Sequence, residues 1–460
     1  MPAVDLAENG KVPSHADALA RWSRALSVSL FLSSIAALII QLGWQAALAQ
    51  RFGGNAELMM ILSVALGLGA GGLIGGLLAP TFSSRSPLLL LAAIAAMNGA
   101  CAYVWSIPTD GAAPMLAVAP VLASALLTGA MLPAALGPLI RRTGSAGSAF
   151  GDCLFAVMLG AAVACLASVS VLQPLFGDWA TPGIAIALNA VVVIGALVAH
   201  CRSAIFIAAT LPQRPPLVSL RRVLLLVAVA GALARSYVVF FARAVTYATA
   251  PSQPAFVATL AAFLLGLAAG ARRAGRHCAL FSAEELMRRA ARSAMAVNLI
   301  GLAALPLIQQ LAWLDGAVIV LVMLLCVMIA RACGALLPYL AELTITTDTA
   351  PGWRSALLCV AYIAGAAAGA CVTGQVLMEQ FGFAAIGAGL VIAGVLYTLL
   401  LVALLDLPRW QKVVRGMTAA AVAVLALALL PSWSANVVER IQAKADAKPA
   451  TGLQHDRSRS

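Results

Sequence analysis

Residues 316–340 read GAVIVLVMLLCVMIARACGALLPYL, a run of 25 residues in which Arg331 is the only charged side chain. A run of this length matches the roughly 20 apolar residues that an α-helix needs to cross the hydrocarbon core of a bilayer. Similar runs recur along the chain from Leu26 to Trp433, with only short polar breaks. The sequence therefore predicts an all-α, polytopic membrane protein.

The overall composition favours the same class. Hydrophobic residues make up 62% of the chain and charged residues 10%, whereas a soluble domain carries roughly 25% charged residues. Transmembrane strands would instead give short segments of alternating hydrophobicity. The stretch before Arg24 is polar, so we expect the first span itself, and not a cleaved signal peptide, to direct insertion.

Thirteen segments are apolar and long enough to be counted as expected helices. They lie at 26–49, 57–79, 87–106, 114–139, 149–173, 182–199, 222–247, 255–271, 293–313, 316–340, 355–378, 383–405 and 416–433. The stretch 272–292, between the eighth and ninth segments, is expected to form a short helix on the membrane surface. Attraction to anionic lipid is the plainest role for its arginines.

The net charge of +12 comes mainly from basic residues in the segments between the expected spans. If the N-terminus is cytoplasmic, every inner segment is basic, whereas the outer loops between spans contain Arg51 as their only basic residue. This asymmetry is the positive-inside pattern. It predicts a multi-pass protein of the bacterial inner membrane with a cytoplasmic N-terminus. The bilayer is then the expected partner, and the basic charge does not indicate nucleic-acid binding.

Three blocks of sequence recur in the same order and divide the chain into two halves. The pairs are Gly67-Leu-Gly-Ala-Gly71 with Gly266-Leu-Ala-Ala-Gly270, Gly129-Ala-Met-Leu-Pro133 with Gly334-Ala-Leu-Leu-Pro338, and Val171-Leu-Gln-Pro-Leu-Phe-Gly177 with Val376-Leu-Met-Glu-Gln-Phe-Gly382. The last two pairs share one offset of 205 residues. The expected parts are a tail (1–25), a first half (26–199), a basic linker (200–221), a second half (222–405), a connector with an extra helix (406–433) and a polar tail (434–460).

Each half has about six spans, so both halves have the same orientation in the membrane. Parallel repeats of this kind resemble the plan of the major facilitator transporters, whose binding sites lie between the repeats. The spacing Gly71 to Gly75, Gly72 to Gly76 and Gly365 to Gly369 is typical of close helix packing.

Several motifs of the chain also resemble the membrane portion of the bacterial spermidine synthase-like proteins. These motifs are Ala37-Leu-Ile-Ile-Gln41-Leu-Gly-Trp44, Arg51-Phe-Gly-Gly54, the glycine-rich second span and Gly-Ala-x-Leu-Pro at Gly129 and Gly334. In that family a polytopic region precedes an aminopropyltransferase-like domain. The resemblance covers roughly residues 26–405.

The chain departs from this family where the chemistry would lie. The family's Tyr-Glu-x-x-Trp-x-Arg reads Ile40-Gln41-Leu-Gly-Trp44-Gln-Ala46 in the first half and Tyr237-Val-Val-Phe-Phe241-Ala-Arg243 in the second. About 27 residues follow the last expected span, too few for the synthase domain. We therefore expect no polyamine synthesis by this chain alone, and a separate protein partner would replace the missing domain.

Three arginines lie inside expected spans, where ionisable groups are costly and often functional. Arg235 lies 13 residues after Arg222, or about 20 Å along a helix, too deep to reach either surface easily. Arg243 lies two turns further, and Arg331 lies within the tenth span. They predict either a site for an anion, because guanidinium groups suit carboxylate and phosphate, or structural bonds to carbonyls and acids.

Four further residues complete the predicted substrate-binding set. Gln41 and Trp44 of the first span and Tyr237 of the seventh are equivalent positions by symmetry, and Tyr362 falls where the family has an asparagine. Other polar residues in the spans, such as Asn98, Asn189 and Asn298, are expected to bond across helices. Asp152 is expected to cap the start of the fifth helix.

Enzyme signatures are missing from the sequence. It contains no P-loop, HExxH, GxSxG or CxxC motif, and its four histidines lie outside the expected spans, so no catalytic, cofactor or metal site is predicted. The leading hypothesis is a non-enzymatic, transporter-like protein that binds or moves a small anionic or amphipathic solute. A non-catalytic subunit or scaffold is the alternative, followed by a membrane-embedded enzyme.

Overall fold

The computed structural model describes residues 15–52, 56–82, 87–105, 114–202, 216–249, 253–310, 315–346, 350–404, 410, 413–414 and 416–428, and these contain helices and no strands. The helices are α1 (His15–Phe52), α2 (Ala56–Phe82), α3 (Pro87–Trp105), α4 (Pro114–Thr143), α5 (Ala146–Ala167), η2 (Ser168–Leu172), α6 (Gln173–Arg202), α7 (Leu220–Thr249), α8 (Gln253–Leu280), α9 (Ala283–Gln310), α10 (Asp315–Thr344), α11 (Pro351–Cys371), η3 (Val372–Leu377), α12 (Met378–Gln380) and α13 (Phe383–Leu404). Twelve candidate spans within these elements are long and apolar enough to cross a membrane.

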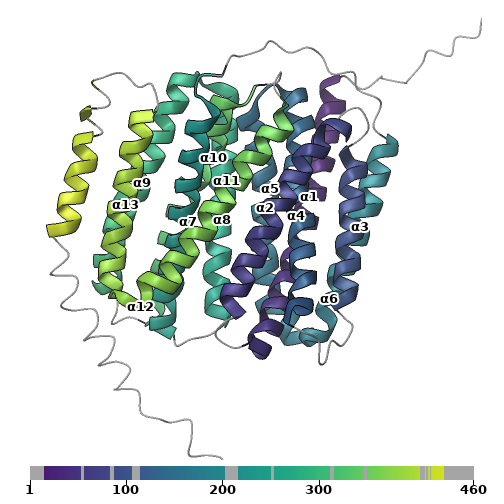
Figure 1. The fold of residues 1–460 in the computed structure, drawn as a ribbon, viewed down its shortest axis with the longest axis horizontal. Helices are drawn as coiled ribbons and strands as arrows, with labels where there is room; N and C mark the ends of the chain where they lie inside the picture. Colours follow the sequence, from purple (N-terminus) through teal and green to yellow (C-terminus); the bar gives the residue numbers. More distant parts are fainter. Residues whose placement is uncertain are drawn as a thin grey trace, which may run out of the picture.

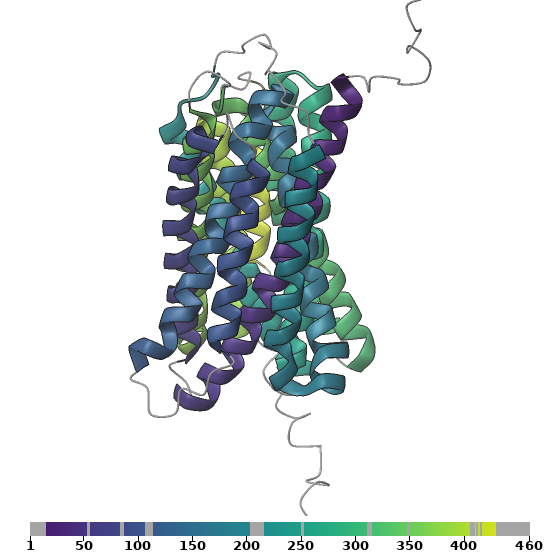
Figure 2. The ribbon, with the colours of Figure 1, turned by 90° about the vertical axis from the view of Figure 1, so that its right-hand side faces the viewer.

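The long helices run side by side in one bundle (Figures 1 and 2). We call the end of the bundle where α1 begins the N-side and the opposite end the far side. Because the helices alternate in direction, α3, α5, α7, α9 and α11 also begin on the N-side. The chain is a polytopic helical membrane protein, as the sequence predicted.

The two halves repeat one packing scheme, and they lie beside each other in Figure 1. In the first half α1 packs on α5 and α6, α2 on α4, and α3 on α6. In the second half α7 packs on α11 and α13, α8 on α10, and α9 on α13. Helix α13 therefore takes the place of a sixth span. The internal repeat predicted from the sequence blocks is confirmed in the packing.

Glycines at matching positions set the closest helix contacts in both halves. A Cβ added at Gly71 would lie 1.8 Å from the carbonyl oxygen of Leu126, and one at Gly270 would lie 2.0 Å from that of Arg331. Such distances leave room only for glycine, so α2 approaches α4 backbone to backbone, and α8 approaches α10 in the same way. These contacts make Leu126 and Arg331 structural counterparts, as the offset of 205 residues requires.

The predicted packing role of the other paired glycines is also confirmed. Gly365 and Gly369 of α11 lie against the backbone of Ala228 and Ala232 of α7. Gly76 of α2 instead lies against α11, across the boundary between the halves.

The predicted surface helix at 272–292 was wrong. Helix α8 continues to Leu280 and α9 begins at Ala283, so the basic stretch is divided between two helices. Glu284 and Glu285 each pair with an arginine four residues later, and such pairs favour extension of a helix. The prediction for Asp152 was also wrong, because Ser145 is the N-cap of α5.

The predicted thirteenth span is represented by a helix at Gly416–Ala428. Its buried residues Ala419, Val422 and Ala426 pack with Val391 and Val395 of α13. Its 13 residues make a helix about 20 Å long, shorter than a bilayer core. Residues 429–433 lie outside the described part of the chain, so the extra span stays a prediction.

Candidate functional site

The two halves share one hydrophobic core on the N-side. This core contains Leu136 and Phe150 from the first half and Val223, Ala274 and Leu340 from the second, all of them fully buried. Because these side chains form one continuous cluster, the halves are closed against each other at this end.

On the far side, each half has a core of its own. The core of the first half includes Ile39 and Val121, and that of the second half includes Val238 and Ile329. A smaller cluster with Cys165 of α5 and Val257 of α8 joins the halves where these two helices meet. Away from the contacts of α5 with α8 and of α2 with α11, the far-side cores of the two halves are separate clusters.

A carboxylate of the second half caps a helix of the first half on the N-side. The side chain of Glu342, near the end of α10, accepts hydrogen bonds from Gly147 N at 2.7 Å and from Ser145 Oγ at 2.8 Å. Both donors lie at the start of α5, where unpaired N–H groups and the helix dipole favour a negative charge. Charge-assisted hydrogen bonds are stronger than neutral ones, so Glu342 stabilises the closed N-side.

Close backbone contacts and charges extend this N-side closure. A Cβ at Gly147 would lie 2.4 Å from Cys278 Sγ and 2.6 Å from the carbonyl oxygen of Pro338, both in the second half. One turn further, Asp152 of α5 interacts electrostatically with Arg272 and Arg276 of α8.

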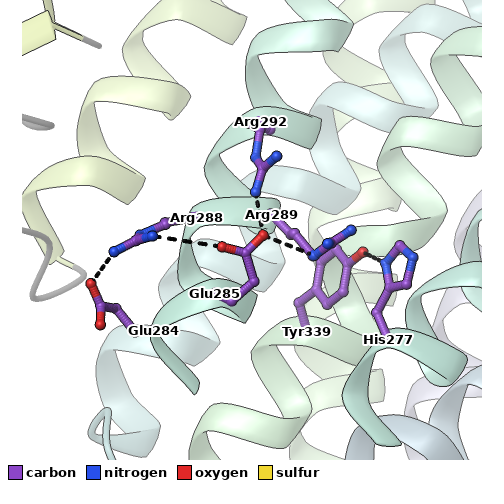
Figure 3. A network of polar contacts seen from close by, with 7 residues as sticks. All are labelled: His277, Glu284, Glu285, Arg288, Arg289, Arg292 and Tyr339. Carbon is purple, nitrogen blue, oxygen red and sulfur yellow. Dashed lines mark hydrogen bonds and ion pairs between the residues drawn. The ribbon is translucent and has the colours of Figure 1, made fainter. Parts of the chain in front are cut away.

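A polar network covers the N-side ends of α8, α9 and α10 (Figure 3). Glu285 lies among three arginines, at 3.8 Å from Arg288 and 3.1 Å from Arg289, with Arg292 also bonded to it. A hydrogen bond of 2.6 Å joins His277 Nδ1 to the Tyr339 hydroxyl. The network fixes the extended ends of these helices and leaves a basic surface.

Arg331 lies on the face of α10 that is turned toward the first half. It precedes Pro338 by seven residues and Glu342 by eleven, spacings that return to nearly the same face of an α-helix. Pro338 and Glu342 both contact Gly147 of α5. Arg331 is exposed, and by this spacing it lies on the face of α10 that contacts α5 nearer the N-side.

Large apolar side chains continue this face toward the far side. Val320, Leu324 and Met328 are 68%, 55% and 44% exposed, and their spacing of four residues keeps them on the same side of α10 as Arg331. The other sides of α10 pack against α7, α8 and α9. This face of α10 thus has an exposed apolar stripe with one guanidinium at the end nearer the N-side.

Arg235 and Tyr362 lie together inside the second half. Both side chains are partly buried, and they interact electrostatically between α7 and α11. Tyr362 packs against the shared N-side core and against the far-side core of the second half. The pair therefore lies where these two cores meet, near the middle of the bundle.

The other predicted site residues lie apart from Arg331. Tyr237 is buried with its hydroxyl against Gly301 of α9, and Trp44 is buried in the far-side core of the first half. Gln41 is partly buried and Arg243 is exposed. The structure therefore brings together Arg235 and Tyr362 and leaves the rest dispersed. Their role in binding a substrate stays a prediction.

Glu342 was not among the residues predicted from the sequence. Its carboxylate lies near the C-terminal end of α10, at a position where the expected span had already ended. The sequence could have indicated it, because an acid three turns after Arg331 and one turn after Pro338 lies on the same helix face as both. Among the described residues, no group of three His, Cys, Asp or Glu side chains is placed to hold a metal ion.

A solved structure has a similar arrangement of helices. The chain is similar to the proton:xylose symporter XylE of the major facilitator superfamily, solved with 6-bromo-6-deoxy-D-glucose bound, at a TM-score of 0.53 and 15% identity. The similarity covers 84% of this chain and 95% of the symporter. The chain has the major facilitator fold. No family model and no curated protein sequence matches it, so the resemblance to spermidine synthase-like proteins stays a prediction.

The major facilitator fold accounts for the architecture described above. Two six-helix halves with the same orientation and an opening between them are what this fold provides. At this level of identity the likeness extends to the fold alone.

Proposed function

We propose that the protein is a secondary transporter of a small anionic or amphipathic solute, which it binds between its halves. The observation that carries this proposal is Arg331, a permanently charged side chain exposed halfway along α10 on the face turned toward the first half. A guanidinium at such depth is costly without a counter-ion, and it suits carboxylate or phosphate groups. The XylE neighbour was solved with a sugar derivative bound, but the charge in this chain favours an anion.

Alternating access would connect the two sides. The N-side is closed by Glu342 and by the glycine contacts of α5, and we infer from the separate far-side cores that the far side is open. Rocking of one half against the other, along the α5–α8 contact, would open the N-side and close the far side. We further propose that the N-side is cytoplasmic, in the bacterial inner membrane, because arginines gather there. These arginines are Arg141, Arg142, Arg272, Arg273, Arg276 and Arg354.

Two cysteine reporters test this function without knowledge of the solute. In a variant that retains only Cys278, the thiol is buried on the N-side. In a second variant, Leu324→Cys is the sole cysteine and faces the far-side opening. We expect a water-soluble maleimide to modify Leu324→Cys quickly and Cys278 slowly. Adding Gly147→Trp to each should open the N-side and reverse this order.

The same experiment separates a transporter from a static scaffold. In a scaffold, Gly147→Trp would expose Cys278 and leave the labelling of Leu324→Cys unchanged, which would overturn the transport proposal. A partner present in stoichiometric amount in native mass spectrometry would favour the subunit alternative. That alternative has one supporting feature, the helix Gly416–Ala428, whose residues Met417, Val424 and Leu427 are exposed.

A further inference from the structure

We infer that the solute is a single-headed anionic amphiphile, with its charged group at Arg331 and its apolar chain along Val320, Leu324 and Met328. This inference deepens the proposed function and rests on it. It arises from the order of groups on one face of α10, where a guanidinium lies at the inner end and only apolar side chains lie between it and the far side.

The charge at the inner end has no counter-ion among the residues that the structure describes. No hydrogen bond or ion pair joins Arg331 to any residue in the described part of the chain. By contrast, the arginines of the N-side network pair with Glu284 and Glu285. An unpaired guanidinium at mid-membrane depth is a binding site for an external anion, and its planar donors suit a carboxylate, sulfonate or phosphate.

The matching positions on α4 of the first half carry no charge. The structural counterpart of Arg331 in the first half is Leu126, and Ala119 lies two turns further toward the far side of α4. Both share a helix face with Gly137, which contacts Gly352 of α11 in the other half. The duplication thus placed a cation at this position of α10 and none at the matching position of α4, so these two facing helices suit one anionic group.

The stripe also defines a length for the apolar part of the solute. Val320 precedes Arg331 by 11 residues, which corresponds to about 16 Å along an α-helix. This is close to the length of a medium-chain acyl group. Affinity should rise as methylene groups are added, because each one buries apolar surface, and it should level off once the chain extends beyond Val320.

Three probes in nanodiscs of neutral phosphatidylcholine test the inference with the full chain. Octanoate has the head and the tail, acetate has the head alone, and octylammonium has the same tail with the opposite charge. We expect octanoate to bind at least about tenfold more tightly than acetate, since several methylenes are buried, and octylammonium not to compete. Equal affinities for octanoate and acetate, or for octanoate and octylammonium, would overturn the inference.

Two variants assign the binding to α10. Arg331→Leu introduces the residue of its structural counterpart and should weaken octanoate binding at least about tenfold, whereas Leu324→Gln should weaken octanoate and leave acetate unchanged. The matched control is Leu66→Gln, at an exposed position of α2 turned away from both α4 and α11. If Arg331→Leu does not fold, Arg331→Lys keeps the charge and should retain part of the affinity. Unchanged octanoate binding in both Arg331→Leu and Leu324→Gln would place the site elsewhere.

An anionic lipid presents the same chemistry as a soluble amphiphile, so a second arm distinguishes the sources. In nanodiscs that contain phosphatidylglycerol, a lipid ligand would displace octanoate from the unmodified chain and not alter Arg331→Leu. That result supports the site and identifies a lipid as its occupant. Failure of all probes, together with alternating labelling of Cys278 and Leu324→Cys, would overturn the solute class and leave the transport proposal intact.

Discussion

Glu342 and Gly147 belong to different halves of the chain, and the Glu342 carboxylate accepts the Gly147 N–H at 2.7 Å. The same carboxylate oxygen accepts the hydroxyl of Ser145, which in turn accepts Ser148 N as the N-cap of α5. One side chain of α10 thus completes the cap of a helix in the other half. Separation of the halves on the N-side must break both bonds, so Glu342 links the closure of the N-side to a single acid.

Replacing Glu342 by glutamine should shift the protein toward a state that is open on the N-side. The amide side chain of Glu342→Gln would keep an acceptor for Gly147 but lose the negative charge at the start of α5. Hydrogen bonds to charged groups contribute about 1.5–3 kcal/mol, and about 1.4 kcal/mol corresponds to a tenfold change in an equilibrium constant. We expect maleimide to modify Cys278 roughly ten times faster in this variant.

The matched control for this measurement is Cys326, which is also buried but lies within α10 in the far-side core of the second half. Its labelling should not change in Glu342→Gln, because opening of the N-side does not unfold the helix. Faster labelling of both cysteines would indicate general loosening and would contradict a specific role for Glu342.

Much of this fold could be predicted from the sequence because lipid allows few alternatives. Apolar runs such as the one around Arg331 must be helices, and the blocks that begin at Gly129 and Gly334 reveal the repeat. The glycines also identify the close contacts, since a bare backbone is what lets two helices approach. Asn98 and Asn298 bond across helices as expected, to Ser124 and Thr398.

The candidate site was harder to predict, because a sequence does not state which way a helix face is turned. Tyr237 and Trp44 come from corresponding helices of the two halves, yet each is buried within its own half. Asn189 bonds to Ala185 of its own helix instead of a neighbour. Arg331 was identified as an intramembrane charge, but only its distance in turns from Pro338 and Glu342, with their contacts to α5, places it between the halves.

Adding a side chain at Gly75 should destabilise the first half. A Cβ at this position would lie 2.2 Å from the carbonyl oxygen of Ala130, so Gly75→Leu must push α2 away from α4. Overpacking of this kind costs about 1–3 kcal/mol, and a lower melting temperature in detergent would report it. Gly195 has no atom within 4 Å of an added Cβ, so Gly195→Leu should melt like the unmodified protein.

Removing the carboxylate of Glu285 should loosen the start of α9. This side chain pairs with Arg288, Arg289 and Arg292, and without it three like charges face one another on adjacent turns. In Glu285→Ala we expect faster hydrogen exchange at residues 283–292, while α8 exchanges as before. Glu284→Ala is the milder control, because Glu284 pairs with Arg288 at a more exposed position. Equal exchange in both variants would show that the network does not hold this end of α9.

The orientation of the bundle can be tested with Cys201, which is exposed on the N-side near the end of α6. Loops rich in arginine stay in the cytoplasm, and the N-side holds Arg141, Arg142 and Arg354. A membrane-impermeant maleimide should therefore fail to reach Cys201, as the sole cysteine, in intact cells and should modify it in inverted vesicles. Glu379→Cys, exposed on the far side at α12, should give the opposite pattern in the same preparations. If Cys201 reacts in intact cells and Glu379→Cys does not, the open side described here faces the cytoplasm, and Arg331 would receive its anion from within the cell.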